Sequence, residues 1–453
     1  MIKFRNIIMG VAATALLLSC GEENKEQPGA AGNGGGTGKP DPEDVRGPFE
    51  NEIGKPLSAW AEGCLDIHAI NSARGECTFF IMPDGTTLCC DAGELAVNSG
   101  EHSRVEQKPN ANTRPFRVYG DYIKYFLPGN VSYMDYMLMT HFHNDHFGTP
   151  TETAYNEITR ASLTWRQTGI MALYDMVPFD KIIDRAYSTN DRDYKFVAET
   201  GKSYSNGIES YANFIYWARN AKGLRVERAK NGSTTQIKLV NNPSKYPTFK
   251  VQVNAVNGEY WNGTESIDPY GDSVPAENGN SISFLMSYGE FDYLTSGDAG
   301  ANTKIENNLA KIINKKIEAM KSHHHFAWDT MSATSMKIYQ PKVVVSQSFY
   351  DHQPDMGHTW TCGGLSYESN SNQAFQKAWA SYGTEEDKYW FFTNIHPKTA
   401  EVYPGEVAKM RSRNGHVVIR VKEGGSEFYV YVLDDTDSQY KVKQIEGPFA
   451  CHK

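Results

Sequence analysis

Short apolar or alternating segments recur along the chain and predict β-strands separated by helices. Successive side chains of a strand point to opposite faces, so alternation indicates a segment with one buried face. Such segments lie at 65–70, 77–82, 88–90, 133–140, 249–253, 281–288, 291–295, 342–346, 389–393, 417–421 and 428–432. Helical spacing of apolar residues predicts helices at 119–127, 207–222 and 305–321. Because strands and helices interleave, the chain is predicted to be a layered α/β protein.

The N-terminus carries a different pattern, which is typical of a targeting segment. Lys3 and Arg5 precede an apolar run at 7–18 that is too short to span a bilayer comfortably. The run ends in Leu-Leu-Ser-Cys-Gly, which looks like a bacterial lipoprotein signal. That resemblance implies a signal peptide at 1–19 and lipid on Cys20, anchored at the periplasmic face or the cell surface. An ordinary secretory signal cut nearby is the alternative, and both readings export the protein.

The residues after Cys20 divide into a polar stretch and a long folded part. Residues 20–48 are rich in Gly, Glu and Pro and predict a flexible tether. The folded domain is expected at 49–453, with an insertion at 150–245 that shapes the substrate pocket. A net charge of −9 disfavours nucleic acid as a partner, although a local basic groove stays compatible with it. Six further cysteines have a spacing that fixes no disulfide pairing.

A cluster of metal-binding residue types follows the strand predicted at 133–140. The chain reads His-x-His-x-Asp-His from His141 to His146. His141 and His143 share one side of an extended chain, whereas the adjacent Asp145 and His146 need a turn. The pattern therefore presents two histidines to one point and an Asp-His pair to a neighbouring point. This arrangement suits two divalent cations side by side, each with a position open to water.

The order of such motifs resembles the metallo-β-lactamase superfamily over roughly residues 60–435. Asp91 in Cys-Cys-Asp-Ala-Gly resembles its first motif, and the histidine cluster resembles the second. Asp298 in Leu-Thr-Ser-Gly-Asp matches the bridging aspartate, and His323-His324 fits the final histidine motif. The resemblance implies a four-layered αβ/βα sandwich with a long insertion.

Within the superfamily, the chain is most similar to the branch containing the extracytoplasmic domain of the DNA-uptake competence channel. The similarity rests on Arg74-Gly75-Glu76-Cys77, where the branch has Gly-Asp-Ala, and on an Asp84-Gly85 turn that leads to Asp91-Ala92-Gly93. It also rests on Asn280-Ser281 before the strand that leads to Asp298. The phosphorylcholine esterases of the superfamily share much of this layout.

The resemblance implies a set of metal ligands that two zinc ions would share, with manganese or iron also compatible with such donors. The set is His141, His143, Asp145, His146, Asp298 and His323 or, after a one-residue slip, His324. Asp91 would fix the tautomer of a ligand imidazole. Because no histidine lies between His146 and His323, the first ion would rely on His141, His143 and Asp298, with Asn280 or water filling in. This departure points away from β-lactam hydrolysis.

The expected reaction is hydrolysis of a small or short phosphodiester by a metal-activated hydroxide, with Asp145, Asp91 and Asp298 as the acting carboxylates. Two alternatives stay open, namely a carbonyl hydrolase for lactones or lactams and a non-catalytic surface metal-binding protein. Oligomeric state is open as well. Substrate contacts are expected from Asn280, His325, Trp328, His352 and His358, against plain loop or packing roles for the same residues.

Overall fold

The structure is a computed structural model that describes residues 46–96, 104–187, 205–273, 275–362, 365–368 and 372–452. All of them belong to one compact unit. The predicted signal peptide, Cys20 and most of the predicted tether lie outside the described residues. Within the described ranges, no helix combines the length and apolar character needed to cross a bilayer.

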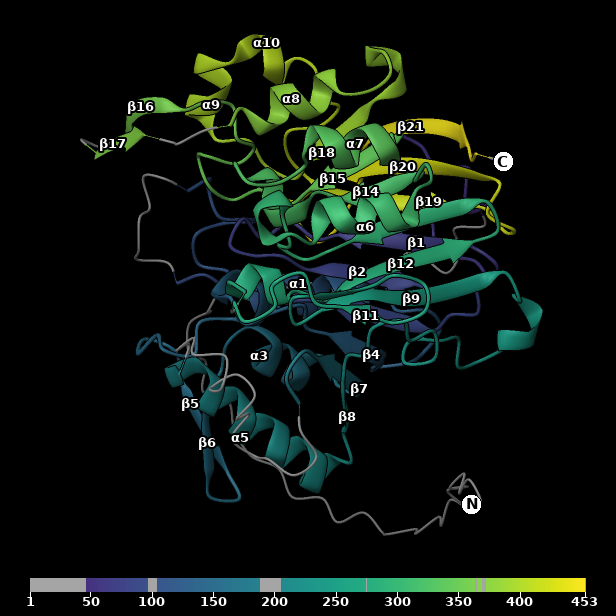
Figure 1. Ribbon diagram of the computed structural model, residues 1–453. Coiled ribbons are helices and arrows are strands. Elements are labelled where there is room, and N and C mark those ends of the chain that lie inside the picture. The colour runs from purple at the N-terminus through teal and green to yellow at the C-terminus, as the bar shows by residue number, and fades with distance from the viewer. Residues whose placement is uncertain are drawn as a thin grey trace, which may run out of the picture. The chain divides into compact units, whose positions relative to one another are not determined.

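Two large mixed sheets form the centre of the unit (Figure 1). The nine-stranded sheet has the order β21 (Val442–Ala450), β20 (Glu427–Leu433), β19 (His416–Val421), β1 (Leu65–Ala69), β2 (Thr78–Ile81), β3 (Thr87–Cys90), β4 (Met134–Leu138), β7 (Phe179–Asp184) and β8 (Arg225–Arg228). Strands β3, β4, β7 and β8 are parallel neighbours, and the others pair antiparallel.

The eight-stranded sheet has a parallel half of its own. Its order is β11 (Ser266–Ile267), β10 (Glu259–Trp261), β9 (Phe249–Val256), β12 (Ser283–Tyr288), β13 (Phe291–Thr295), β14 (Ala319–Lys321), β15 (Val343–Ser346) and β18 (Tyr389–Phe392). Strands β13, β14, β15 and β18 are parallel neighbours. Two small hairpins stand apart, β5 (Glu157–Arg160) with β6 (Leu163–Arg166) and β16 (Thr359–Cys362) with β17 (Leu365–Glu368).

Alternate side chains of the strands face different cores, and this creates four layers. On β14, Ala319 packs between the two sheets while Met320 packs under helices. Helices α1 (Pro115–Phe126), α3 (Gly169–Met176) and α5 (Ser205–Lys222) cover the nine-stranded sheet. Helices α6 (Glu306–Ile313), α7 (Ala333–Tyr339) and α8 (Ala374–Ala380) cover the other sheet. The α/β class and the αβ/βα layering are therefore confirmed.

The remaining helical segments are short and lie in the connections. They are α2 (Asn144–Phe147), α9 (Pro397–Val402), α10 (Pro404–Val407) and the 3-10 turns η2 (Pro243–Lys245), η3 (Glu277–Asn280), η4 (Ala301–Thr303), η5 (His323–Phe326) and η6 (Glu385–Asp387).

The helix predicted at 305–321 is wrong in its second half. Helix α6 ends at Ile313, because Asn314 takes a left-handed conformation with φ 43°. The chain then enters β14, three fully buried residues between two parallel neighbours. A strand of three residues is too short to show the alternation of apolar and polar residues that identifies strands. Its apolar residues therefore looked like a continuation of the helical spacing before it.

The interval 150–245 contributes to the central sheet as well as to its surroundings. Strands β7 and β8 from this interval pair parallel to β4 and to each other. Only the hairpin β5–β6 stands outside both large sheets among the strands described there.

Candidate metal centre

The predicted site residues come from the carboxyl ends of parallel strands in both sheets. Asp91 follows β3 and the stretch 141–146 follows β4, while Asp298 follows β13 and the stretch 323–325 follows β14. The carboxyl ends of parallel strands meet at one edge of a sheet, which is where α/β proteins place ligand sites. The packing of the two sheets brings both edges together.

A close backbone approach holds the loop after β4 in place. A Cβ atom on Gly93 would lie 1.7 Å from the carbonyl oxygen of Asp145, so only glycine fits there. The amides of Ala92 and Glu76 donate to the carbonyls of His146 and Asp145 at 2.9 and 2.8 Å. These hydrogen bonds hold the histidine loop between the segment before β2 and the segment after β3.

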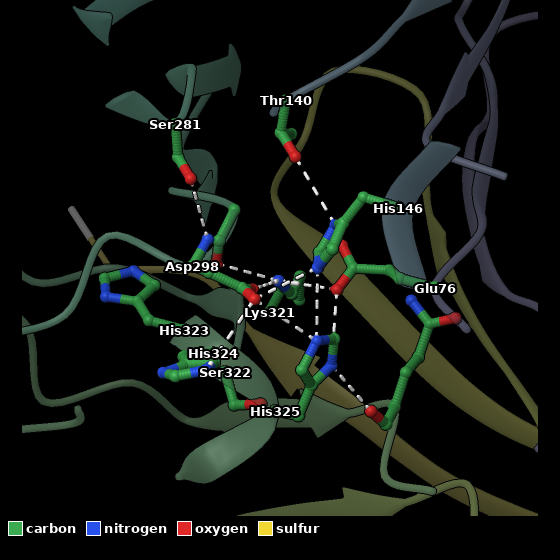
Figure 2. A network of polar contacts seen from close by, with 12 residues as sticks. Glu76, Thr140, His146, Ser281, Asp298, Lys321, Ser322, His323, His324 and His325 are labelled. Atoms are coloured by element: carbon green, nitrogen blue, oxygen red, sulfur yellow. Dashed lines mark hydrogen bonds and ion pairs between the residues drawn. The ribbon is translucent and has the colours of Figure 1, made fainter. Parts of the chain in front are cut away.

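One carboxylate oxygen lies at the middle of the centre, namely Oδ2 of Asp298 (Figure 2). Four imidazole Nε2 atoms surround it, at 3.1 Å for His146, 3.5 Å for His325, 3.7 Å for His141 and 4.0 Å for His324. An oxygen facing several imidazole nitrogens is suited to bridge two cations.

Half-site one consists of His141, His143 and Asp298, whose ligand atoms all lie within 4.8 Å of one another. Nε2 of His141 is 3.0 Å from Nδ1 of His143. Both histidines come from the alternating end of the strand, as the sequence predicts. No described contact brings the side chain of Asn280 into this group.

Half-site two consists of Asp145, His146 and His325 together with the shared Asp298. The two imidazole Nε2 atoms are 3.2 Å apart, and Nε2 of His325 is 3.4 Å from Oδ2 of Asp145. The one-turn helix α2 carries Asp145 and His146, which supplies the turn that the adjacent pair requires.

Asp91 fixes the orientation of imidazoles in both half-sites. Its Oδ2 accepts from Nδ1 of His146 at 2.8 Å and from the hydroxyl of Thr140 at 2.7 Å. The Thr140 oxygen lies 3.1 Å from Nδ1 of His141 and accepts that proton. Each imidazole thus keeps a proton on Nδ1 and turns Nε2 towards Asp298, where a cation can take the place of a second proton.

His325 is held in the same tautomer by a different acceptor. Its Nδ1 lies 2.9 Å from the carbonyl oxygen of Gln347, which can only accept. Oε2 of Glu76 is 3.5 Å from the same nitrogen. Glu76 lies within 4.8 Å of half-site two, but it faces the protonated side of the ring and therefore positions His325 rather than binding the ion.

Two charged residues that sequence reasoning missed complete the centre. The buried Nζ of Lys321 lies 2.7 Å from Oε2 of Glu76 and 3.7 Å from Oδ1 of Asp298, and it donates to the carbonyl of Gly297. The only signal for these residues was charge beside otherwise apolar strands, Glu76 before β2 and Lys321 at the end of β14.

The structure corrects the expected order of the three consecutive histidines. His323 turns away, with its Nδ1 3.2 Å from Oε2 of Glu306. His325, expected to contact the substrate, is fully buried and faces Asp298. The physical reason is a left-handed backbone, since φ is 44°, 52° and 65° at His324, His325 and Phe326. Such a turn redirects successive side chains in a way that alignment by motif does not anticipate.

Asn280 and Trp328 lie on the segments next to the centre. Asn280 is buried at the end of η3, and the next residue, Ser281, accepts a hydrogen bond from the amide of Asp298 at 3.1 Å. Trp328 is 44% exposed, three residues beyond His325.

His352 and His358 belong to neither half-site. His352 stacks on Tyr350 with ring centroids 5.0 Å apart. His358 is buried and donates to the carbonyl of Pro354 at 3.1 Å, within its own loop. These contacts favour loop packing over the predicted substrate contact.

The two half-sites differ in how their imidazoles hold protons. Burial and the neighbouring His146 keep the pKa of His141 well below its usual value. Burial would also lower the pKa of His325, but Asp298 and Asp145 outweigh it and raise that pKa to about 9. The pKa of His146 is raised for the same reason, and that of Asp298 is lowered well below its usual value.

The charges of the centre call for cations. Asp91, Glu76, Asp145 and Asp298 are four carboxylates, and Lys321 is the one ammonium among these contacts. With neutral imidazoles the net charge is minus three, and uncompensated buried charge is costly. Two divalent cations would change it to plus one. The N and O donors fit zinc, manganese or iron, so the residues suit two divalent ions.

No protein-family model and no curated protein matches the chain. Solved structures similar to it include CmlA, a diiron β-hydroxylase from Streptomyces venezuelae, at 11% identity and a TM-score of 0.33, covering 81% of this chain and 55% of that one. A putative metal-dependent hydrolase from Parabacteroides distasonis is 12% identical with a TM-score of 0.30, covering 73% and 94%. Zn²⁺-bound PqqB from Methylobacterium extorquens is 10% identical with a TM-score of 0.31, covering 78% and 99%. Similarities this low carry no argument about the reaction.

Proposed function

We propose that this protein is a metal-dependent hydrolase that holds two divalent cations and cleaves a small or short phosphodiester. The observation that carries the proposal is the position of Asp298, whose Oδ2 faces the imidazoles of both half-sites. A shared carboxylate between two sets of N and O donors is typical of two-metal hydrolytic centres.

Bound divalent ions lower the pKa of a coordinated water to about 7 and stabilise the charge that develops in displacement. The protein's own residues prepare that chemistry. Asp91 and Gln347 hold the imidazoles of His146 and His325 in the ligating tautomer. Lys321 offsets part of the carboxylate charge through Glu76.

A cysteine nucleophile is disfavoured next to the centre. Burial raises the pKa of the Cys77 and Cys90 thiols well above the usual value. The thiolate needed for attack is therefore scarce at neutral pH, and a metal-activated water is the better nucleophile.

The two cations favour a phosphodiester over a neutral carbonyl compound. Four carboxylates, one ammonium, two divalent ions and an attacking hydroxide sum to a net charge of zero, so the preference rests on the two cations themselves and not on the net charge of the centre. Two cations can also hold the attacking and leaving oxygens of an in-line displacement. A lactone or lactam hydrolase is the second candidate, since the same ions polarise a carbonyl.

The test is turnover by the purified protein loaded with zinc or manganese. The panel contains an aromatic phosphodiester, a phosphocholine ester, a short single-stranded oligonucleotide, a lactone and a β-lactam. We expect phosphodiester turnover with two bound ions. His141→Ala should keep the fold and lose turnover, while His452→Ala, far along the chain, should keep both. Turnover of the lactone or lactam alone would replace the phosphodiester proposal, and two bound ions without any turnover would leave a metal-binding protein.

We also propose that the protein is exported and anchored to a bacterial membrane through lipid on Cys20. The support is the N-terminal pattern of a short apolar run ending in Leu-Leu-Ser-Cys-Gly. Cys20→Ser should move the protein from the membrane fraction to the soluble fraction. Membrane association that survives the substitution would contradict the anchor.

A further inference from the structure

Half-site one has fewer protein donors than half-site two. Counting the shared Asp298, half-site one has three donors and half-site two has four. The chain between His146 and His323 contains no histidine that could supply another. His324 is the remaining imidazole whose Nε2 faces Asp298 Oδ2, at 4.0 Å.

His324 is held in the tautomer that a metal ligand needs. Its Nδ1 lies 2.7 Å from Oδ1 of Asp329. A carboxylate can only accept, so Nδ1 carries a proton and Nε2 is left to accept from a donor or to bind a cation. A carboxylate behind an imidazole is the usual support of a ligating histidine. His324, with its side chain 24% exposed, is also more accessible than the imidazoles of His141, His146 and His325.

The contacts of His324 place it on the side of half-site one. Nδ2 of Asn278 is 3.3 Å from Nε2 of His324. Asn278 belongs to η3, and Glu277 of the same turn accepts from the amide of Phe142 at 2.9 Å. Phe142 lies between His141 and His143. His324 and the two histidines of half-site one therefore border the same turn.

The left-handed backbone explains how adjacent residues can reach both half-sites. With φ positive at His324 and His325, the two rings diverge, and their centroids are 6.2 Å apart (Figure 2). His325 faces His146 and Asp145, whereas His324 contacts Asn278 and Asp329. Non-glycine residues adopt this conformation at a cost, and strained backbone is concentrated at functional sites.

We propose that His324 is the third imidazole ligand of half-site one, which rests on the proposed two-cation centre. Ligands of one zinc ion are about 3.3 Å apart, given metal–ligand bonds of about 2.0–2.2 Å. The 4.0 Å between Nε2 and Asp298 Oδ2 needs a shift of less than about 1 Å, which a partly exposed side chain can make. Asn278 then exchanges its contact with Nε2 for one with solvent.

This ligand changes how the substrate is inferred. With His324, half-site one has three imidazole donors, although the sequence has no histidine between His146 and His323. The missing histidine then no longer separates phosphodiester chemistry from carbonyl chemistry. The substrate panel decides between them.

The experiment measures metal binding in variants of the three adjacent histidines. Zinc affinity is titrated against a chelator, and the cobalt-loaded proteins are compared by absorption spectroscopy. His324→Ala should bind one ion at least tenfold more weakly, keep the other, and change the cobalt spectrum. His323→Ala is the matched control, because that ring faces Glu306, and it should bind both ions as the parent does. Asp329→Asn should weaken the same ion by a smaller factor.

Parent-like affinity and an unchanged cobalt spectrum in His324→Ala would overturn the proposal. Equal losses in His323→Ala and His324→Ala would overturn it too, because they would report a disturbed loop. His324→Gln, which is closer in size, gives the same readout if the alanine variant does not fold. Binding through His324 without turnover of any substrate would leave this inference standing while the proposed hydrolase fails.

Discussion

The two loops that bring imidazoles to Asp298 have different backbone conformations. The loop at 140–146 is an extended strand end followed by a right-handed turn of helix. The loop at 322–326 is left-handed at three consecutive residues. Side chains of the first loop point where the strand period sends them, whereas those of the second are redirected by the turn. Sequence spacing therefore predicts which side chains face a metal ion only where the backbone is a regular strand or a right-handed helix.

The loops also differ in the charge that surrounds them. His141 is buried beside another imidazole, and its pKa is lowered. His325 is buried among carboxylates, and its pKa is raised to about 9. The first half-site is ready for a cation at neutral pH, whereas the second must release protons before it can bind one.

The largest effect is expected where the two loops meet. Asp298→Asn keeps the shape and removes the shared charge, so both ions should bind about a hundred- to thousandfold more weakly, from the roughly 3–5 kcal/mol lost when one partner of a buried charge pair is removed. Chelator titration measures it. Asp175→Asn, which removes a surface pair with Arg160, should change nothing. A loss confined to one ion would show that Asp298 is not shared.

The next effect is a difference in pH dependence between the half-sites. The proton on His325, with its pKa about 9, competes with the ion below that pH. Apparent affinity at half-site two should therefore rise at least about tenfold per pH unit between pH 7 and 8, because the raised pKa of His146 adds a second competing proton. The affinity of half-site one should rise less steeply over this range, because the pKa values of His141 and His143 are lowered and only that of His324 is raised. Titrations at three pH values with half-site variants separate the two ions, and equal slopes would refute the contrast.

A smaller effect is expected from the support of the imidazoles. Asp91→Asn should weaken both ions about 10–100-fold, as loss of a partner behind a ligand does. Asparagine tolerates the φ of 60° at this position, so the backbone should survive. Thr140→Val removes the acceptor for His141 and one donor to Asp91, so it should weaken half-site one more than half-site two. Metal content after dialysis against a weak chelator reports both variants.

The smallest effect on metal affinity is expected from a substitution of Glu306, the carboxylate that His323 contacts. Glu306 accepts from the amides of Met331 and Ser332 at 2.9 and 2.7 Å, as well as from His323. Burial would raise its pKa, but these donors hold the pKa below the usual value. Its stabilisation is thus present above about pH 4.5 and is lost as the pH falls below that. Glu306→Gln should lower the free energy of unfolding by about 2 kcal/mol at pH 7, measured in urea, with metal affinity within threefold. A large metal loss would place His323 in the centre after all.

The part of the site that sequence predicts is the part fixed by strand ends. His141, His143, Asp145, His146 and Asp298 lie together because each directly follows a parallel strand or its first turn. The layered fold followed from the interleaved strands and helices for the same reason.

The rest depends on contacts that spacing does not encode. Glu76 and Lys321 reach the centre only through the packing of one sheet on the other. His325 faces Asp298 and His323 faces Glu306 because of a left-handed turn, which no residue preference predicts. Strand β14 was not predicted, because three residues are too few to show the alternation of apolar and polar residues.

The buried ammonium of Lys321 has a consequence for the order of events during maturation. The ammonium is a fixed positive charge beside Glu76 and Asp298. The raised pKa values of His146 and His325 add positive charges that are lost when a proton leaves. Folding therefore does not have to wait for metal. The chain can close around protons and an amine, and metal loading becomes an exchange of those protons for cations.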